Sequence, residues 1–208
     1  GLVSQYNGVN INRIARLNSD GSYDASFNQT ISLTGEINVI AVQSDGKIIC
    51  GGSFKDGGNF RYLVRLNADG SKDLSFNLGL GNNCLVTAIK IQDDGKIVFG
   101  GTLTTYNGTP VNNLARLNAD GTLDTTFSIG LIPNTFNQVN SIDIQNDGKI
   151  IIGTNYNGSI PNLFRYDING IQDTSFHPIL GGDNHILTIN IQSDGKTILG
   201  GNFRSYDN

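Results

Sequence analysis

Charged side chains that recur at a fixed spacing are the best candidates for chemistry in this sequence. The segments RLNSDGSYDASF, RLNADGSKDLSF, RLNADGTLDTTF and RYDINGIQDTSF each hold one arginine and one later aspartate. Such a set could be an array of charges for binding or a set of cross-strand ion pairs. We favour ion pairs, because a three-residue turn between the two positions would place them face to face. The pairs are Arg16 with Asp24, Arg65 with Asp73, Arg116 with Asp124, and Arg165 with Asp173.

Within the first of these segments, the residues from Asn18 to Asp24 are rich in oxygen ligands and resemble a calcium loop. Calcium needs six to eight oxygen atoms, which aspartate-rich turns can supply. However, the glycine comes at the fourth position, so the loop closes too early for an EF-hand-like site. If Asp24 faces Arg16, its carboxylate is also occupied. We therefore predict structural turns and no metal site.

Other catalytic constellations are sparse. His177 and His185 are the only histidines, and Cys50 and Cys84 the only cysteines. Cys50 replaces an apolar residue of the other repeats and reads as a core residue; both thiols are expected to be unpaired, with a disulfide as the alternative. No glycine-rich loop leads into a helix, so the phosphate-binding mechanism is missing. Asp56, Asp143 and Asp183 have no place in the repeat and form no motif. We predict no catalytic residue and no cofactor.

Eight turns of the type x-Asp-Gly or x-Asn-Gly position these side chains. A three-residue hairpin loop needs a left-handed residue, and glycine adopts that conformation without strain. The turn between Leu17 and Tyr23 would pair these two residues and so set the register. The turn glycines are Gly21, Gly46, Gly70, Gly95, Gly121, Gly148, Gly170 and Gly195.

A second signature follows each first one and completes a period of about fifty residues. It reads IAVQSDGKIICGG, IKIQDDGKIVFGG, IDIQNDGKIIIGT and INIQSDGKTILGG. Its consecutive apolar residues indicate strands that are covered on both faces. Four strand-like runs in each period predict an all-β, β-propeller-type array of four-stranded antiparallel blades. The repeats cover approximately 1–51, 52–100, 101–153 and 154–200 of a single domain, and 201–208 starts a further repeat.

Candidate ligand-binding residues lie where the repeats vary, after the two signatures. Tyr6 and Tyr106 occupy equivalent positions, and Tyr156 lies nearby in its own repeat. A recurring tyrosine could stack on a ligand or fill the space between blades; we favour packing and keep these residues as candidates. Asn107 and His185 complete the candidate set.

The charge balance argues against nucleic acid as a partner. The chain has 14 basic and 18 acidic residues and a formal charge of -4, whereas phosphate contacts need clustered lysine and arginine. No apolar run is long enough for a membrane span. Gly1 aligns with Gly101, inside a repeat, so we interpret the chain as a fragment of a longer array. We favour four blades of a larger ring over a closed four-bladed ring, because the last residues overlap the first ones in phase.

The two signatures together resemble the delta-60 repeat family, a predicted β-propeller repeat. The matching residues are Arg16 to Phe27 and Gln43 to Phe54, with their three later copies. The resemblance implies large secreted or surface proteins of bacteria, or tail and fibre proteins of bacteriophages. It therefore implies an extracellular, cell-surface or virion location. The expected function is a non-enzymatic structural and recognition module that binds a glycan or a surface protein, or other chains of its assembly. The alternative is a propeller enzyme, a hydrolase or lyase, with its site at the ring centre.

Overall fold

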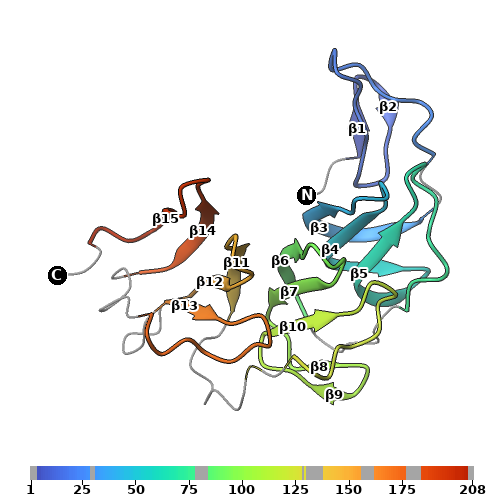
Figure 1. The fold of residues 1–208 in the computed structure, drawn as a ribbon. Coiled ribbons are helices and arrows are strands. Elements are labelled where there is room, and N and C mark those ends of the chain that lie inside the picture. The colour runs from blue at the N-terminus through green and yellow to red at the C-terminus, as the bar shows by residue number, and fades with distance from the viewer. Residues whose placement is uncertain are drawn as a thin grey trace.

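A computed structural model describes residues 4–28, 31–77, 84–127, 129, 138–155, 162–176 and 184–205. In this part of the chain all the regular elements are strands, and they form small antiparallel sheets. The sheets follow one another along an arc, and the first and last sheets lie at its two ends (Figure 1). The predicted all-β propeller-type array is therefore confirmed.

Three of the sheets in the described residues are full blades with the same strand order. The first blade holds β3 (Leu33–Val42), β4 (Ile48–Asp56) and β5 (Asn59–Leu66). The second holds β6 (Val86–Ile91), β7 (Ile97–Gly101) and β10 (Leu114–Leu117). The third holds β11 (Val139–Ile144), β12 (Ile150–Thr154) and β13 (Leu163–Tyr166).

The remaining described strands are short or come from incomplete blades. β14 (Ile186–Ile191) pairs with β15 (Thr197–Gly201) after the third blade. Two-residue strands form small hairpins: β1 (Gln5–Tyr6) with β2 (Val9–Asn10), and β8 (Thr105–Tyr106) with β9 (Thr109–Pro110). In the first blade β4 and β5 are longer, and their paired ends form the equivalent hairpin.

The fourth strand of each blade is reduced to a single bridge. Leu66 bridges Lys72 in the first blade and Leu117 bridges Leu123 in the second. The strand ends early because the next aspartate begins a turn: the Oδ1 atom of Asp73 accepts hydrogen bonds from the N–H and hydroxyl of Ser75. The predicted four-stranded blade is present, but its outer strand is very short.

The turn register predicted from the sequence is confirmed. Leu17 bridges Tyr23, and the N–H of Asp24 donates to the carbonyl of Arg16 over 3.0 Å. The N–H of Gly21 closes the turn on the carbonyl of Asn18. All eight predicted turn glycines have a φ between +82° and +88°.

Buried apolar residues fill the spaces between successive blades. Every residue of β7 and β12 is buried, as the consecutive apolar runs predict. Their side chains point alternately to the two neighbouring blades: Phe99 belongs to the cluster shared with the first blade and Val98 to the cluster shared with the third. The blades are therefore held to each other by apolar burial.

The second glycine of each Gly-Gly pair lies at a bulge between the inner two strands. A Cβ atom at Gly101 would lie 1.7 Å from the carbonyl oxygen of Leu85, and one at Gly52 would lie 2.0 Å from that of Glu36. The pairing register shifts at the same place. Only glycine allows the two backbones to approach this closely.

Candidate functional site at the inner strands

The strands β3, β6, β11 and β14 line the inner side of the arc (Figure 1). Each packs against the next: β3 against β6, β6 against β11, and β11 against β14. These strands carry side chains that do not repeat. One residue of each inner strand pairs with the equivalent residue in the second strand of its blade. These four residues are Ala41 on β3, Lys90 on β6, Asp143 on β11 and Asn190 on β14.

Lys90 and Asp143 form an ion pair between the second and third blades. The Nζ of Lys90 lies 2.9 Å from the Oδ1 of Asp143. The lysine side chain is 42% exposed and the aspartate side chain 11% exposed. The pair thus presents a solvent-accessible ammonium group that is anchored on a nearly buried carboxylate.

Asp143 also binds the inner edge of the following strand. Its Oδ2 accepts a hydrogen bond of 2.7 Å from the N–H of Ile191, and the hydroxyl of Ser141 accepts one of 3.0 Å from the N–H of Ile189. Both side chains lie on β11, and both N–H groups belong to β14. The carboxylate is therefore fixed by bonds from two neighbouring blades, which limits its motion.

Sequence reasoning does not assign this pair. Asp143 stands out as an aspartate outside the repeat, but nothing in the sequence indicates its partner. Lys90 lies in the QxDGK signature region of a different repeat, 53 positions away by number. A comparison of equivalent positions in the four repeats could have indicated the pair. Two repeats hold alanine or asparagine at this position, so the fold does not require a charged side chain there.

The predicted arginine–aspartate pairs are present in all four repeats, away from the inner row. The Nε-to-Oδ2 distance is 2.7 Å for Arg16–Asp24 and 2.8 Å for both Arg65–Asp73 and Arg116–Asp124. Arg165 places a terminal nitrogen 2.9 Å from the Oδ2 of Asp173. Each arginine also stacks on the phenylalanine that ends its signature: Phe27, Phe76, Phe127 and Phe176.

The environment of these aspartates stabilises the ionised form. Burial by itself raises the pKa of Asp73, but hydrogen bonds from Ser75 and the charge of Arg65 outweigh it and lower the pKa to about 2. The pKa of Asp124 is lowered in the same way, by Thr126, Lys96 and Arg116 against burial. A carboxylate held by several donors is a structural anchor and a poor general acid.

The candidate tyrosines make contacts within the fold. The buried hydroxyl of Tyr106 donates to the carbonyls of Gly121 and Asn77 over 2.7 and 3.1 Å. Its ring packs edge-on against Phe99 with 5.7 Å between centroids. The hydroxyl of Tyr6 donates to the equivalent carbonyl of Gly21. A ligand-binding role for either tyrosine stays a prediction.

The other candidate ligand residues do not gather at one place. Asn107 lies in the turn between β8 and β9 with a φ of 49°. His185 precedes β14, and its backbone N–H and carbonyl bond to Asn184 and Asn202. Tyr156 lies outside the described residues. Tyr106, Asn107 and His185 therefore belong to two different blades.

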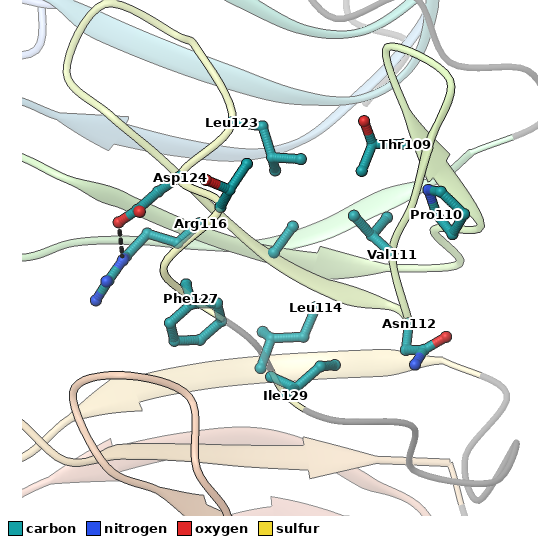
Figure 2. Close-up of a pocket in the computed structure, with 12 residues that line it drawn as sticks. Thr109, Pro110, Val111, Asn112, Leu114, Arg116, Leu123, Asp124, Phe127 and Ile129 are labelled. Atoms are coloured by element: carbon teal, nitrogen blue, oxygen red, sulfur yellow. Dashed lines mark hydrogen bonds and ion pairs between the residues drawn. The ribbon is translucent and has the colours of Figure 1, made fainter.

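A cavity of about 320 Å³ opens beside the outer strands of the second blade (Figure 2). Its apolar wall includes Leu114, Phe127 and Ile129, which also pack toward the third blade. Arg116 and Asp124 lie at one side, joined by their hydrogen bond (Figure 2). Both charged groups already have partners within the fold, so the cavity adds apolar surface but no reactive group.

Within the described ranges, no three His, Cys, Asp or Glu residues are grouped closely enough to hold a metal ion. Cys50 and Cys84 are both buried and are not joined by a disulfide, and burial raises the pKa of the Cys50 thiol to about 12. In the same ranges no helix is long and apolar enough to cross a membrane.

The repeats, the blades and the short outer strands define a class of protein, the β-propeller repeat proteins. The chain belongs to the family described as "Domain of unknown function (DUF5122) beta-propeller", which matches residues 1–27, 43–76, 92–127 and 145–176. Each matched range after the first begins near a QxDGK turn and ends at the phenylalanine of the next signature. A search of curated proteins finds no match to this sequence.

Solved structures share this fold at low sequence identity. A protein of unknown function from Bacteroides caccae is 15% identical, with a TM-score of 0.54, over 91% of this chain and 61% of that one. A gluconolactonase from Xanthomonas campestris is 12% identical, with a TM-score of 0.57, over 91% of this chain and 62% of that one. The chain thus spans less than two thirds of either structure, and the likeness establishes the fold alone.

The gluconolactonase corrects two expectations from the sequence. The prediction of a non-enzymatic display module of a tail or fibre protein is wrong on this comparison, as is the prediction that the chain is not an enzyme. Both rested on the lack of a catalytic motif in the repeats, on the acidic polar surface and on the family resemblance. That reasoning is insufficient because a repeat scaffold also holds charged side chains at inner-strand positions that do not repeat, such as Lys90 and Asp143.

Proposed function

We propose that this chain is part of a β-propeller hydrolase whose site lies at the inner strands, with a sugar-derived lactone as the substrate class. The observation that carries the proposal is the Lys90–Asp143 pair, with its exposed ammonium and its anchored carboxylate. The structural likeness to a gluconolactonase supports the reaction class. A lactone is a cyclic ester, and its hydrolysis needs one water molecule and no redox cofactor.

The chemistry assigned to Lys90 is electrostatic. When water attacks the ester carbonyl carbon, negative charge develops on the carbonyl oxygen. A fixed ammonium group near that oxygen stabilises the charge, and the loss of one such group typically lowers kcat about 10²- to 10³-fold. The intermediate then collapses, the ring C–O bond breaks, and the leaving alkoxide takes up the proton that the attacking water released. The product is the open hydroxy acid.

Asp143 acts as a positioning residue in this proposal. Its Oδ1 faces the lysine and its Oδ2 is bonded to Ile191, so its role is to orient Lys90. The fold does not require this pair, because β3 packs on β6 with Ala41 at the equivalent position and β14 holds Asn190 there. Retaining a partly buried charge pair has a desolvation cost, which supports a functional reason for it.

The test is hydrolysis of glucono-δ-lactone, followed by acid release with a pH indicator. We expect the chain to exceed the uncatalysed rate and the Lys90→Met variant to lose most of that excess. Lys72→Met is the matched control, because Lys72 also forms an ion pair that does not recur, with Asp56 in the first blade. Equal rates for Lys90→Met and the wild type, with both folded by circular dichroism, would overturn the proposal.

The finer assignments are proposals of the same kind. The RLNxDG and QxDGK signatures support classing these repeats as delta-60 repeats within the propeller family. An extracellular or cell-surface location and a glycan partner agree with a sugar-derived substrate. Nucleic acid is not proposed as a partner, because the formal charge of -4 opposes contact with phosphates.

A further inference from the structure

Strand β6 carries backbone N–H groups on its inner edge that point away from its partner β7. Hydrogen-bonded and non-bonded residue pairs alternate along an antiparallel ladder. The N–H of Gln92 donates to the carbonyl of Lys96 over 2.8 Å, which makes these two a bonded pair. Ile91 and Ile97 form the next pair, which is therefore non-bonded. The N–H of Ile91 thus faces the inner side of the arc, and that of Ile89 does the same two residues earlier (Figure 1).

Strand β14 shows what such N–H groups bind. Ile189 and Ile191 occupy the equivalent positions of β14. The N–H of Ile189 donates to the hydroxyl of Ser141 over 3.0 Å. The N–H of Ile191 donates to the carboxylate of Asp143 over 2.7 Å. The contact between β11 and β14 therefore contains an example of a carboxylate bound to an N–H group of an inner edge, which is a charge-assisted and hence strong hydrogen bond.

The contact between β3 and β6 is equivalent but lacks the acceptors. Ala41 of β3 occupies the position that Asp143 has on β11. Val39 occupies the position of Ser141. Both side chains pack against the apolar core between the first two blades, and neither has an atom that can accept a hydrogen bond. The N–H of Ile91 therefore receives no acceptor from the side chains of β3.

Space and charge at this contact both favour an anionic group. An alanine side chain ends at its Cβ atom, so Ala41 leaves room for the atoms that form the carboxylate of Asp143 in the equivalent contact. Ala41 and Ile91 are both half-buried, so solvent reaches this part of the inner edge. Lys90 directly precedes Ile91, and its side chain is 42% exposed. Its positive charge attracts an anion to the same strand.

We propose that the N–H of Ile91, opposite Ala41 and beside Lys90, is a subsite for the carboxylate group of a ligand. The identity of the ligand rests on the proposed function: hydrolysis of a sugar-derived lactone releases a polyhydroxy acid, and its carboxylate takes the place that Asp143 fills in the equivalent contact. The subsite therefore recognises the product of the reaction. Binding of the product there competes with the lactone and inhibits the enzyme.

The first test gives Ile91 an acceptor from the chain itself. Ala41→Asp copies the arrangement of Asp143, and the contact between β11 and β14 shows that the fold accommodates an aspartate there. We expect D-gluconate to bind this variant at least tenfold more weakly than the wild type in titration calorimetry. Asn190→Asp, which adds the same charge to β14, should keep the wild-type affinity. D-Sorbitol, which lacks the carboxylate, should bind the wild type much more weakly than D-gluconate. Equal affinity of wild type and Ala41→Asp for D-gluconate, with both folded by circular dichroism, would overturn the proposal.

The second test observes the N–H groups directly in the wild type. In nitrogen-15 NMR spectra, D-gluconate should shift the amide signal of Ile91 and leave that of Ile191, which is already bonded to Asp143, in place. An Ile91 signal that does not move, including the case of no binding at all, contradicts the proposal. The readout is independent of catalysis. A chain that binds D-gluconate at Ile91 without hydrolysing the lactone supports the subsite and overturns the enzyme, whereas hydrolysis with an unmoved Ile91 signal overturns the subsite alone.

Discussion

The Nε of Arg65 lies 2.8 Å from the Oδ2 of Asp73, and the two side chains are only 6% and 7% exposed. The same arginine reaches the carbonyl of Ala119 in the next blade and stacks on Phe76 at 4.5 Å. One guanidinium group thus joins the two outer strands of a blade to its neighbour. This arrangement recurs along the arc, so the repeat is a unit of blade-to-blade attachment.

Removal of a buried arginine should destabilise the fold more than removal of an exposed one. We expect Arg65→Ala to lower the free energy of unfolding by about 3 kcal/mol, because the buried Asp73 carboxylate loses its partner. Arg16→Ala, in the equivalent pair whose arginine side chain is 39% exposed, should cost clearly less because solvent screens the charges. Urea unfolding measures both. Equal losses for the two variants would show that burial does not decide the strength of the pair.

Stability should fall in acid because the folded state holds Asp73 ionised. The pKa of Asp73 is about 2 in the fold against an ordinary value of 3.8, so the folded state gains stability above pH 4 and loses it as the pH falls toward 2. Unfolding free energies measured between pH 5 and pH 2 should follow this slope. Ser75→Ala, which removes the hydrogen bond from the hydroxyl to the carboxylate and keeps the one from the backbone N–H, should flatten it in part. An unchanged slope in that variant would contradict this account.

Two turn glycines with similar φ values should differ in tolerance. Gly21 has a φ of 83° and open space where a side chain would begin, whereas a Cβ at Gly121 would lie 2.7 Å from the carbonyl oxygen of Asn77. Gly21→Ala should therefore cost about 1 kcal/mol from the left-handed backbone alone. Gly121→Ala should cost clearly more, because the Asn77 backbone must also move. Thermal melting of both variants tests the difference, and an equal effect would mean that the blades can shift freely.

The hydroxyl of Tyr106 should contribute to stability. It is buried and donates to two carbonyls, so Tyr106→Phe should cost about 1–2 kcal/mol by leaving those acceptors unpaired. Tyr6→Phe removes one comparable bond at an exposed site and should cost less. Denaturant unfolding gives both values. If Tyr106→Phe melts like the wild type, the packing role of the hydroxyl is wrong and a ligand role gains support.

The Lys90–Asp143 pair makes a prediction that separates positioning from direct contact. Asp143→Asn keeps the shape of the side chain but removes its charge, so Lys90 is held less firmly. We expect lactone hydrolysis to lose kcat with little change in KM, and Lys90→Met to lose more than Asp143→Asn. Steady-state kinetics at several lactone concentrations measure the split. A larger loss in Asp143→Asn than in Lys90→Met would reverse the assigned roles.

Local sequence patterns are sufficient to predict the repeat, the turn register and the blade architecture. Asp-Gly turns act over a few residues, and a fixed turn sets which residues face each other, so the spacing of Arg16 and Asp24 is enough to pair them. The consecutive apolar residues of KIVF similarly predict a strand that is buried on both faces.

Contacts between residues of different repeats depend instead on how the blades pack. Lys90 and Asp143 lie on separate blades, and their contact depends on the rotation from one blade to the next, which no local pattern encodes. The same is true of Arg65 and Ala119. Short-range patterns predict each blade, but the candidate site arises only when the blades pack along the arc.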